Sequence, residues 1–307
     1  MLTAHSKIKA NSWFAGGFWN WSGFAPHNGY SVKTASAAIE SCREHGVQDV
    51  FFTMWGDDGG ECSKFAMLPA LFYASELAKG NTDDANIKEK FKEKFKEKFG
   101  VSFECFMLLD LPGTPGGRAD VVCNAEKYLL YNDCFTGLMN SMLEGGENEQ
   151  YEACARQLDR MKKEENWGYL FAAAQALCET LAIKAQLGEK TRQVYESKDR
   201  EALKLLLGDY RQVIKKLEVF YKAYKKQWFI ENKPHGFDVQ DIRIGGLIAR
   251  IRSCQERLQE LYDGKVCVIE ELEEKQLDFC GKGEELSSEH GCFNSWGKTV
   301  TANVLSW

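Results

Sequence analysis

The chain has 307 residues, of which 44% are hydrophobic and 12% are aromatic, and it carries a formal net charge of −6. This length permits one large domain or two of ordinary size, and the hydrophobic content excludes extensive disorder. The acidic balance gives no support for nucleic acid or an anionic membrane surface as a partner, and no apolar run is long enough for a membrane-spanning helix.

The cysteine pattern and the first residues of the sequence indicate the cellular compartment. Eleven cysteines are scattered without CxxC pairs, and the opening stretch MLTAHSKIKANSW lacks the apolar segment of a signal peptide. We therefore expect a cytoplasmic protein with reduced thiols. We expect neither a bound metal nor another cofactor.

Residues 12–80 have the rhythm of two consecutive βα units. The pattern predicts strands over 12–21 and 47–55 and helices over 31–45 and 64–80. Two such units imply parallel strands joined by right-handed crossovers. Two strands neither close a barrel nor complete a sheet, so this region is predicted to be a piece of a larger α/β structure.

A repeated Lys-Glu-Lys-Phe pattern follows at 87–100 and places Phe91, Phe95 and Phe99 on one face of a predicted helix. The favoured interpretation is a helix that packs its phenylalanine stripe against the protein. The alternative is a helix lying on a membrane surface, because basic residues flank the aromatic ones.

From about residue 120 to 280 the pattern is helical, with predicted helices over 149–187, 199–230 and 238–262. Their apolar spacing is typical of an antiparallel helical bundle. Gly245 and Gly246 interrupt the third helix, which predicts a close approach by another element or by a ligand. The final residues, 294–307, are predicted to be extended.

A candidate binding site lies where the second predicted strand ends, in the stretch VFFTMWGDDGGECS. Strand alternation places Thr53, Trp55 and Asp57 on one side. An indole face packs against the C–H face of a pyranose, and a carboxylate accepts hydrogen bonds from vicinal hydroxyls. Ligands bind at this end of parallel strands, so the pattern indicates a carbohydrate site. The same alternation on the first strand adds Trp19 and Trp21.

Other roles for these residues stay open. Trp19 and Trp21 fit a simple aromatic cap on a core. Asp57, Asp58 and Glu61 could form a divalent-metal cluster, although their spacing differs from that of an EF-hand loop. Asp58 or Glu61 could instead cap the helix predicted to start near residue 63.

Three segments resemble a known family. SWFAGGFWNWSGFAPHNGYS and DVFFTMWGDDGGECSKFAMLPALFYASELAKG resemble the last two βα units of the glycoside hydrolase family 20 barrel, in its bacterial exo-β-N-acetylglucosaminidase subgroup. WFIENKPHGFDVQDIRIGGLIARI resembles that subgroup's helical C-terminal domain. The implied fold class is α/β plus all-α. Residues 1–82 would be the C-terminal part of a (β/α)8 TIM-barrel catalytic domain, and 83–307 an α-helical C-terminal domain with an extended tail.

The resemblance also implies roles at the site. Many family members carry Trp-x-Glu after the eighth strand, where the Trp forms a wall of the −1 subsite and the carboxylate binds the 4- and 6-hydroxyls of the sugar. Trp55 and Asp57 take these places here. Asp58 is an alternative to Asp57, because aspartate is one methylene shorter than glutamate. Trp19 and Trp21 would line the same pocket.

The catalytic segment of the family is missing from this sequence. The family's Asp-Glu pair belongs to a His-x-Gly-Gly-Asp-Glu type segment after the fourth strand, and no such segment occurs in the 307 residues. In the family the Glu is the general acid, and the Asp orients the acetamido group whose oxygen attacks the anomeric carbon. We therefore expect no catalytic residue in this chain and no hydrolysis by the chain alone.

The expected partners follow from the resemblance. They are glycans with terminal β-linked N-acetylglucosamine, a second copy of the chain bound through the helical domain, and the missing N-terminal half of the barrel. Neither nucleic acid nor membrane is expected. The alternatives are a noncatalytic helical interaction protein and a sugar-binding module without chemistry.

Overall fold

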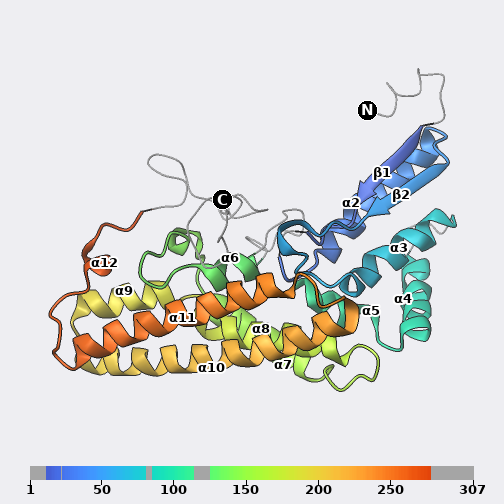
Figure 1. Ribbon diagram of the computed structural model, residues 1–307. Coiled ribbons are helices and arrows are strands. Elements are labelled where there is room, and N and C mark those ends of the chain that lie inside the picture. The colour runs from blue at the N-terminus through green and yellow to red at the C-terminus, as the bar shows by residue number, and fades with distance from the viewer. Residues whose placement is uncertain (1–11, 22, 81–84, 114–124, 278–307) are drawn as a thin grey trace. The chain divides into compact units, whose positions relative to one another are not determined.

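The computed structural model describes residues 12–21, 23–80, 85–113 and 125–277, except for the side chains of Asp58 and of residues 85–88. The described residues are mostly helical, with a two-stranded parallel sheet and no closed barrel (Figure 1). This confirms the predicted fold class of a small α/β part and an all-α part. The chain forms two compact units, one ending at Asp110 and the other including the described residues from Leu111 onward. The domain boundary at 82–83 stays a prediction.

Two βα units open the first compact unit. Strand β1 (Trp13–Gly17) is followed by helix α2 (Asn28–Glu44), and strand β2 (Asp49–Thr53) is followed by helix α3 (Leu68–Ala78). The strands are parallel, with Trp13 opposite Asp49 and Gly17 opposite Thr53. Both strands are shorter than predicted, so the residues that follow them belong to irregular connections.

Helices cover one face of this sheet. On that face the rings of Phe18 and Phe52 stack at a centroid distance of 4.6 Å. Phe52 packs against a buried cluster drawn from α2, α3 and the neighbouring segments. On the other face, Trp13 and Phe51 form an edge-to-face pair and remain 67% and 44% exposed. The sheet therefore has a packed face and an open aromatic face.

The phenylalanine repeat lies on helix α4 (Ala85–Phe99) and packs inside the first unit. Phe95 is fully buried and its ring lies 5.4 Å from those of Phe72, on α3, and Phe103, on α5 (Phe103–Met107). The packing interpretation of the repeat is thus confirmed. No helix in the described part of the chain is both long and apolar enough to cross a membrane.

The start of α2 is held by a carboxylate from far along the chain. Asp110 accepts hydrogen bonds from the backbone N–H groups of Asn28 and Gly29, both at 2.8 Å. The side-chain amide of Asn28 also donates to Asp110 and to the carbonyl of Ala66. A negative group at a helix N-terminus is favourable, so this contact fixes α2 against the segment that precedes α3.

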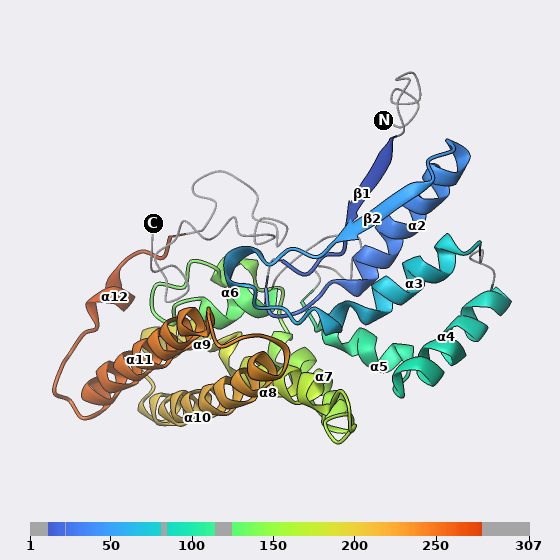
Figure 2. The same cartoon turned by 45° about the vertical axis from the view of Figure 1, so that its right-hand side comes forward.

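The second compact unit is a helical bundle, as predicted (Figure 2). The long helices α10 and α11 pack side by side, α10 also packs on α8, and α8 packs on α7. Apolar residues at helical spacing on α10, including Leu206, Val213 and Leu217, are buried in this bundle. The helices are α6 (Ala125–Tyr131), α7 (Glu147–Asp159), α8 (Gly168–Lys184), α9 (Leu187–Ser197), α10 (Arg200–Glu231), α11 (Phe237–Tyr262) and α12 (Glu270–Glu273).

The prediction of a close approach at Gly245 is wrong. Gly245 lies on the exposed side of α11, and a Cβ added there would meet no atom within 4 Å. No described element approaches Gly245, so close packing does not explain this glycine.

Arg250 links three segments of the bundle, which are α11, the turn after α6 and α12. Arg250, on α11, binds Asp133 through Nε at 2.6 Å and Nη2 at 3.1 Å, and Nη2 also donates to Glu271 on α12 at 2.7 Å. Burial alone would raise the pKa of Asp133, but the hydrogen bonds and charge of Arg250 outweigh burial and lower that pKa to about 2. Two-point binding of this kind is stronger than a single surface ion pair.

This pKa predicts how stability responds to acid. A carboxyl group with a lowered pKa in the folded state stabilises the fold above its unfolded pKa, near 4, and loses that contribution as the pH falls toward about 2. We expect Asp133→Asn to cost roughly 2 kcal/mol at pH 7 and much less at pH 2.5. Urea unfolding at both pH values measures the difference.

Asp159 offers a control for this measurement, because its ion pair with Lys162 lies on the surface. Asp159→Asn should change stability little at either pH. An equal cost of Asp133→Asn at pH 7 and pH 2.5 would show that the Arg250 contact does not depend on the charge of Asp133.

Candidate functional site

The candidate site is built where β1 and β2 end. The indole N–H of Trp55 donates to the hydroxyl of Thr53, the last residue of β2, at 2.7 Å. Thr53 in turn donates to the carbonyl of Gly16 on β1 at 3.1 Å. The indole of Trp55 is 57% exposed. A strand-end hydroxyl therefore orients a large aromatic ring that remains open to solvent.

Trp21 lies over the end of β1. A Cβ added at Gly17 would come within 2.9 Å of the Trp21 ring and 3.7 Å of the Thr53 hydroxyl. The Trp21 ring thus occupies the space that only a glycine leaves free, next to the hydroxyl that holds Trp55. Since β1 ends at Gly17, this position comes from the chain folding back and not from strand alternation.

Trp19 packs on Trp21, with ring centroids 4.4 Å apart, and meets Tyr30 edge to face. Two hydrogen bonds hold the backbone of Trp19 against the start of α2. The N–H of Trp19 donates to the Ser31 hydroxyl at 2.8 Å, and its carbonyl accepts from the N–H of His27 at 2.8 Å. Trp19 and Trp21 are half-buried, so they have a structural role while part of their surface stays accessible.

The acidic residues of the loop have different surroundings. Asp57 is exposed and begins a 3-10 turn, Asp57–Gly59. Asp58 lies in the same turn, and its side chain is outside the described part of the structure. Glu61 is buried. Among the described residues, no three or more His, Cys, Asp or Glu side chains are grouped to hold a metal ion. The Ser63 hydroxyl accepts a hydrogen bond from the N–H of Phe65 at 3.1 Å.

Sequence reasoning missed Lys64. Its ammonium group donates to the carbonyl of Trp55. Burial lowers the pKa of Lys64, while the charges of Cys62 and Asp57 act in the opposite direction. The sequence does contain a signal for this contact, which is a lysine directly after an acidic, glycine-rich loop. When the chain reverses in such a loop, the lysine ammonium group returns to the carbonyls and carboxylates of the loop.

Sequence reasoning also missed Asn20, between Trp19 and Trp21. The residue is 2% exposed, and neither the nitrogen nor the oxygen of its amide has a hydrogen-bond partner among the described residues. An unsatisfied buried amide is unfavourable by about 1–3 kcal/mol. The one polar side chain within the aromatic run FWNW was the available signal for a polar group at this site.

The site therefore combines indole rings, a solvent-exposed carboxylate and a buried amide at the carboxyl-terminal edge of two parallel strands. Aromatic faces hold the C–H surface of a ring compound, and the polar groups bind its hydroxyls. This arrangement suits a polar ring compound, and it lies at the end of the strands where α/β proteins bind ligands.

The fold and site together define a chain with a short parallel α/β part followed by a helical domain. Residues 104–290, more than half of the chain, match the family model described as the Glycoside Hydrolase 20C C-terminal domain. The chain belongs to this family. A search of curated proteins finds no match to the chain.

The contact between Gly17 and Trp21 gives a direct test of the site's geometry. We expect Gly17→Ala to lower the free energy of unfolding by about 1–3 kcal/mol, because the added methyl group overlaps the Trp21 ring. Urea denaturation followed by circular dichroism measures this change. The same substitution in a Trp21→Ala background should cost much less, which a double-mutant cycle detects.

Ala15→Ser provides a control on the same strand, because Ala15 is exposed and should tolerate the change. Additive effects of Gly17→Ala and Trp21→Ala would contradict the described packing of the Trp21 ring over the strand.

Proposed function

We propose that the chain is part of a β-N-acetylhexosaminidase that removes terminal, non-reducing β-linked N-acetylglucosamine, and that it supplies one wall of the sugar-binding subsite. The observation that carries the proposal is the exposed Trp55 indole, held by Thr53 beside the Trp21 ring at the ends of parallel strands. The family match of the helical part supports the same assignment.

Each residue of the site has a role in this proposal. Trp55 packs against the C–H face of the sugar in the −1 subsite, with Trp21 and Trp19 extending the aromatic surface. Asp57 or Asp58 accepts hydrogen bonds from the 4- and 6-hydroxyls. Asn20, whose amide atoms are buried, offers a donor and an acceptor to a bridging water. Binding of this kind positions the substrate and leaves bond cleavage to other groups.

The chemistry requires a second polypeptide segment. The proposed route uses the substrate's acetamido oxygen as nucleophile, oriented by an aspartate, while a glutamate protonates the leaving oxygen. The chain contains no His-x-Gly-Gly-Asp-Glu segment to provide this pair. The open sheet face with Trp13 and Phe51 supports a missing set of strands, because an uncovered apolar sheet is unfavourable in water.

The purified chain should therefore not hydrolyse 4-nitrophenyl N-acetyl-β-D-glucosaminide. Adding a polypeptide with the first six βα units and the Asp-Glu segment should restore release of 4-nitrophenol. Turnover by the chain alone would refute the missing-pair proposal. A stable complex of the two polypeptides without turnover would refute the proposed activity.

In the reconstituted enzyme, Trp55→Ala should lower kcat/KM at least tenfold, equivalent to about 1.4 kcal/mol of lost transition-state binding. Phe229→Ala removes another exposed aromatic ring, on α10 in the helical unit, and should leave kcat/KM unchanged. Equal effects of the two substitutions on kcat/KM would show that Trp55 does not contact the substrate.

A second proposal concerns the partner of the helical domain. Leu205, Val219 and Ile230 recur at helical spacing on the side of α10 away from its buried residues, and each is more than half exposed. Apolar residues in such a row favour association, and we propose that this face, the α10 stripe, joins two copies of the chain.

Light scattering on the purified chain tests this proposal. The expected mass is that of a dimer, and Val219→Glu should give a monomer because it places a charge in the apolar contact. Lys204→Glu, which changes an exposed charge near the start of α10, should keep the dimer. A monomeric parent chain, or a Val219→Glu variant that remains dimeric, would contradict the α10 stripe as the interface.

A further inference from the structure

A cavity lies within the helical unit, between the α9–α10 corner and the segment that links α11 to α12. Its volume is about 380 Å³, which falls within the range of small-molecule sites. Apolar side chains, among them Leu203, Leu261 and Val268, line part of the cavity. We name it the α9–α11 pocket.

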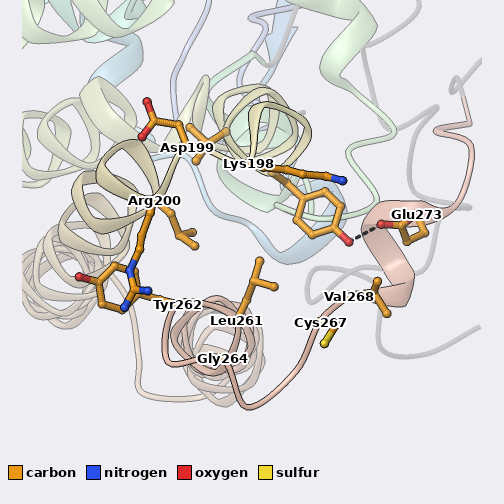
Figure 3. A pocket seen from close by; sticks show the side chains of 12 residues that line it. Lys198, Asp199, Arg200, Leu261, Tyr262, Gly264, Cys267, Val268 and Glu273 are labelled. Atoms are coloured by element: carbon orange, nitrogen blue, oxygen red, sulfur yellow. Dashed lines mark hydrogen bonds between the residues drawn. The ribbon is translucent and has the colours of Figure 1, made fainter.

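Charged groups surround this apolar surface. Figure 3 shows Arg200 and Tyr262 on one side of the α9–α11 pocket. The ammonium group of Lys198 extends toward the other side, where Glu273 and Cys267 lie. The pocket thus has cations on two sides of an apolar interior.

The carboxylates of the pocket are already engaged. Asp199 caps helix α10 and accepts hydrogen bonds from the N–H groups of Glu201 at 2.9 Å and Ala202 at 3.1 Å. Glu273 accepts a hydrogen bond from the hydroxyl of Tyr195. Both carboxylates therefore accept internal hydrogen bonds, and no salt bridge joins either of them to Lys198 or Arg200 among the described residues.

The cations are less engaged, although, after the hydrogen bond from Gln259, the charge of Arg200 also helps to lower the pKa of the nearby Asp263 carboxylate. Among the described residues, neither Lys198 nor Arg200 takes part in an ion pair. The guanidinium of Arg200 stacks on the Tyr262 ring at 4.6 Å, which orients the group and leaves its N–H donors for another acceptor. The nearby carboxylate of Asp263 is bound by Gln259 at 2.9 Å and by Lys265 at 3.3 Å.

The backbone places Lys198 at this position. Lys198 ends α9 with φ of +56°, a conformation that is uncommon for residues other than glycine. The left-handed turn lets α10 begin two residues later, so Lys198 and Arg200 come to the same pocket from a single corner. The side chain of Lys198 is exposed and free to reach a ligand.

We propose that the α9–α11 pocket binds a small organic anion, in which an apolar or aromatic ring carries a phosphate or carboxylate group. The ring occupies the apolar interior, and the anionic group pairs with Arg200 or Lys198 at the edge. Arginine suits this role, because its planar donors match two oxygens of a phosphate or carboxylate. This site is independent of the sugar site at the strand ends.

Calorimetric titration of the full chain tests the proposal with four probes. Phenyl phosphate and benzoate carry a ring and an anion, inorganic phosphate carries the anion alone, and benzyl alcohol carries the ring alone. We expect phenyl phosphate or benzoate to bind with a Kd below 1 mM, at least tenfold more tightly than the other two probes. The ring anion with the lower Kd identifies the anionic group that the pocket prefers.

Arg200→Gln and Lys198→Asn should each weaken that binding about five- to tenfold, and asparagine tolerates the left-handed backbone at 198. Lys204→Gln removes a lysine outside the pocket and should have no effect. Circular dichroism establishes that each variant is folded. Absence of binding by both ring anions, or equal weakening by Lys204→Gln, would overturn the proposal.

Cys267 gives a local readout, because its thiol is exposed and lines the pocket. The bound ring anion should slow alkylation of Cys267 by iodoacetamide, as measured by peptide mass spectrometry, while Cys105 keeps its rate. Binding without protection of Cys267 would place the ligand elsewhere and refute this pocket as its site.

Discussion

The parallel pairing of β1 and β2, with the described helices packed on one face, is the constraint on which the first unit depends. Phe18 and Phe52 bury their rings against α2 and α3, and Asp110 holds the start of α2 through three hydrogen bonds. The packed face is therefore held by contacts within the first unit. The opposite face keeps Trp13 and Phe51 in solvent, which is the feature expected of strands that belong to a larger sheet.

The same strand pair positions the candidate site. Because β2 ends at Thr53, that hydroxyl is free to orient the Trp55 indole, and because β1 ends in glycine, the Trp21 ring can lie over it. Two short strands thus bring residues from separate connections together. The helical unit adds the family relationship and the α9–α11 pocket, which combines charged groups with an apolar lining.

Sequence pattern predicted the βα units, the packed phenylalanine repeat and the long helices, because period and apolar spacing report directly on burial. It failed where the chain leaves regular structure. Trp19 and Trp21 lie beyond the end of β1, so their contacts come from the turn and from hydrogen bonds to Ser31 and His27, which no local period encodes. The open space at Gly245 depends on tertiary packing. So do the hydrogen bond from Asn28 to Asp110 and the hydrogen bond from Lys64 to the Trp55 carbonyl.

The central claim is that the Trp55 indole forms a sugar-binding surface. Its most direct test is a titration of the ¹⁵N-labelled chain with N-acetylglucosamine, in which the indole N–H signals are assigned by substitution. We expect the signals of Trp55 and Trp21 to shift with sugar concentration, while that of Trp13, an exposed indole at the other end of the sheet, stays fixed. An unmoved Trp55 signal, or an equal shift of Trp13, would exclude Trp55 from a sugar-binding surface.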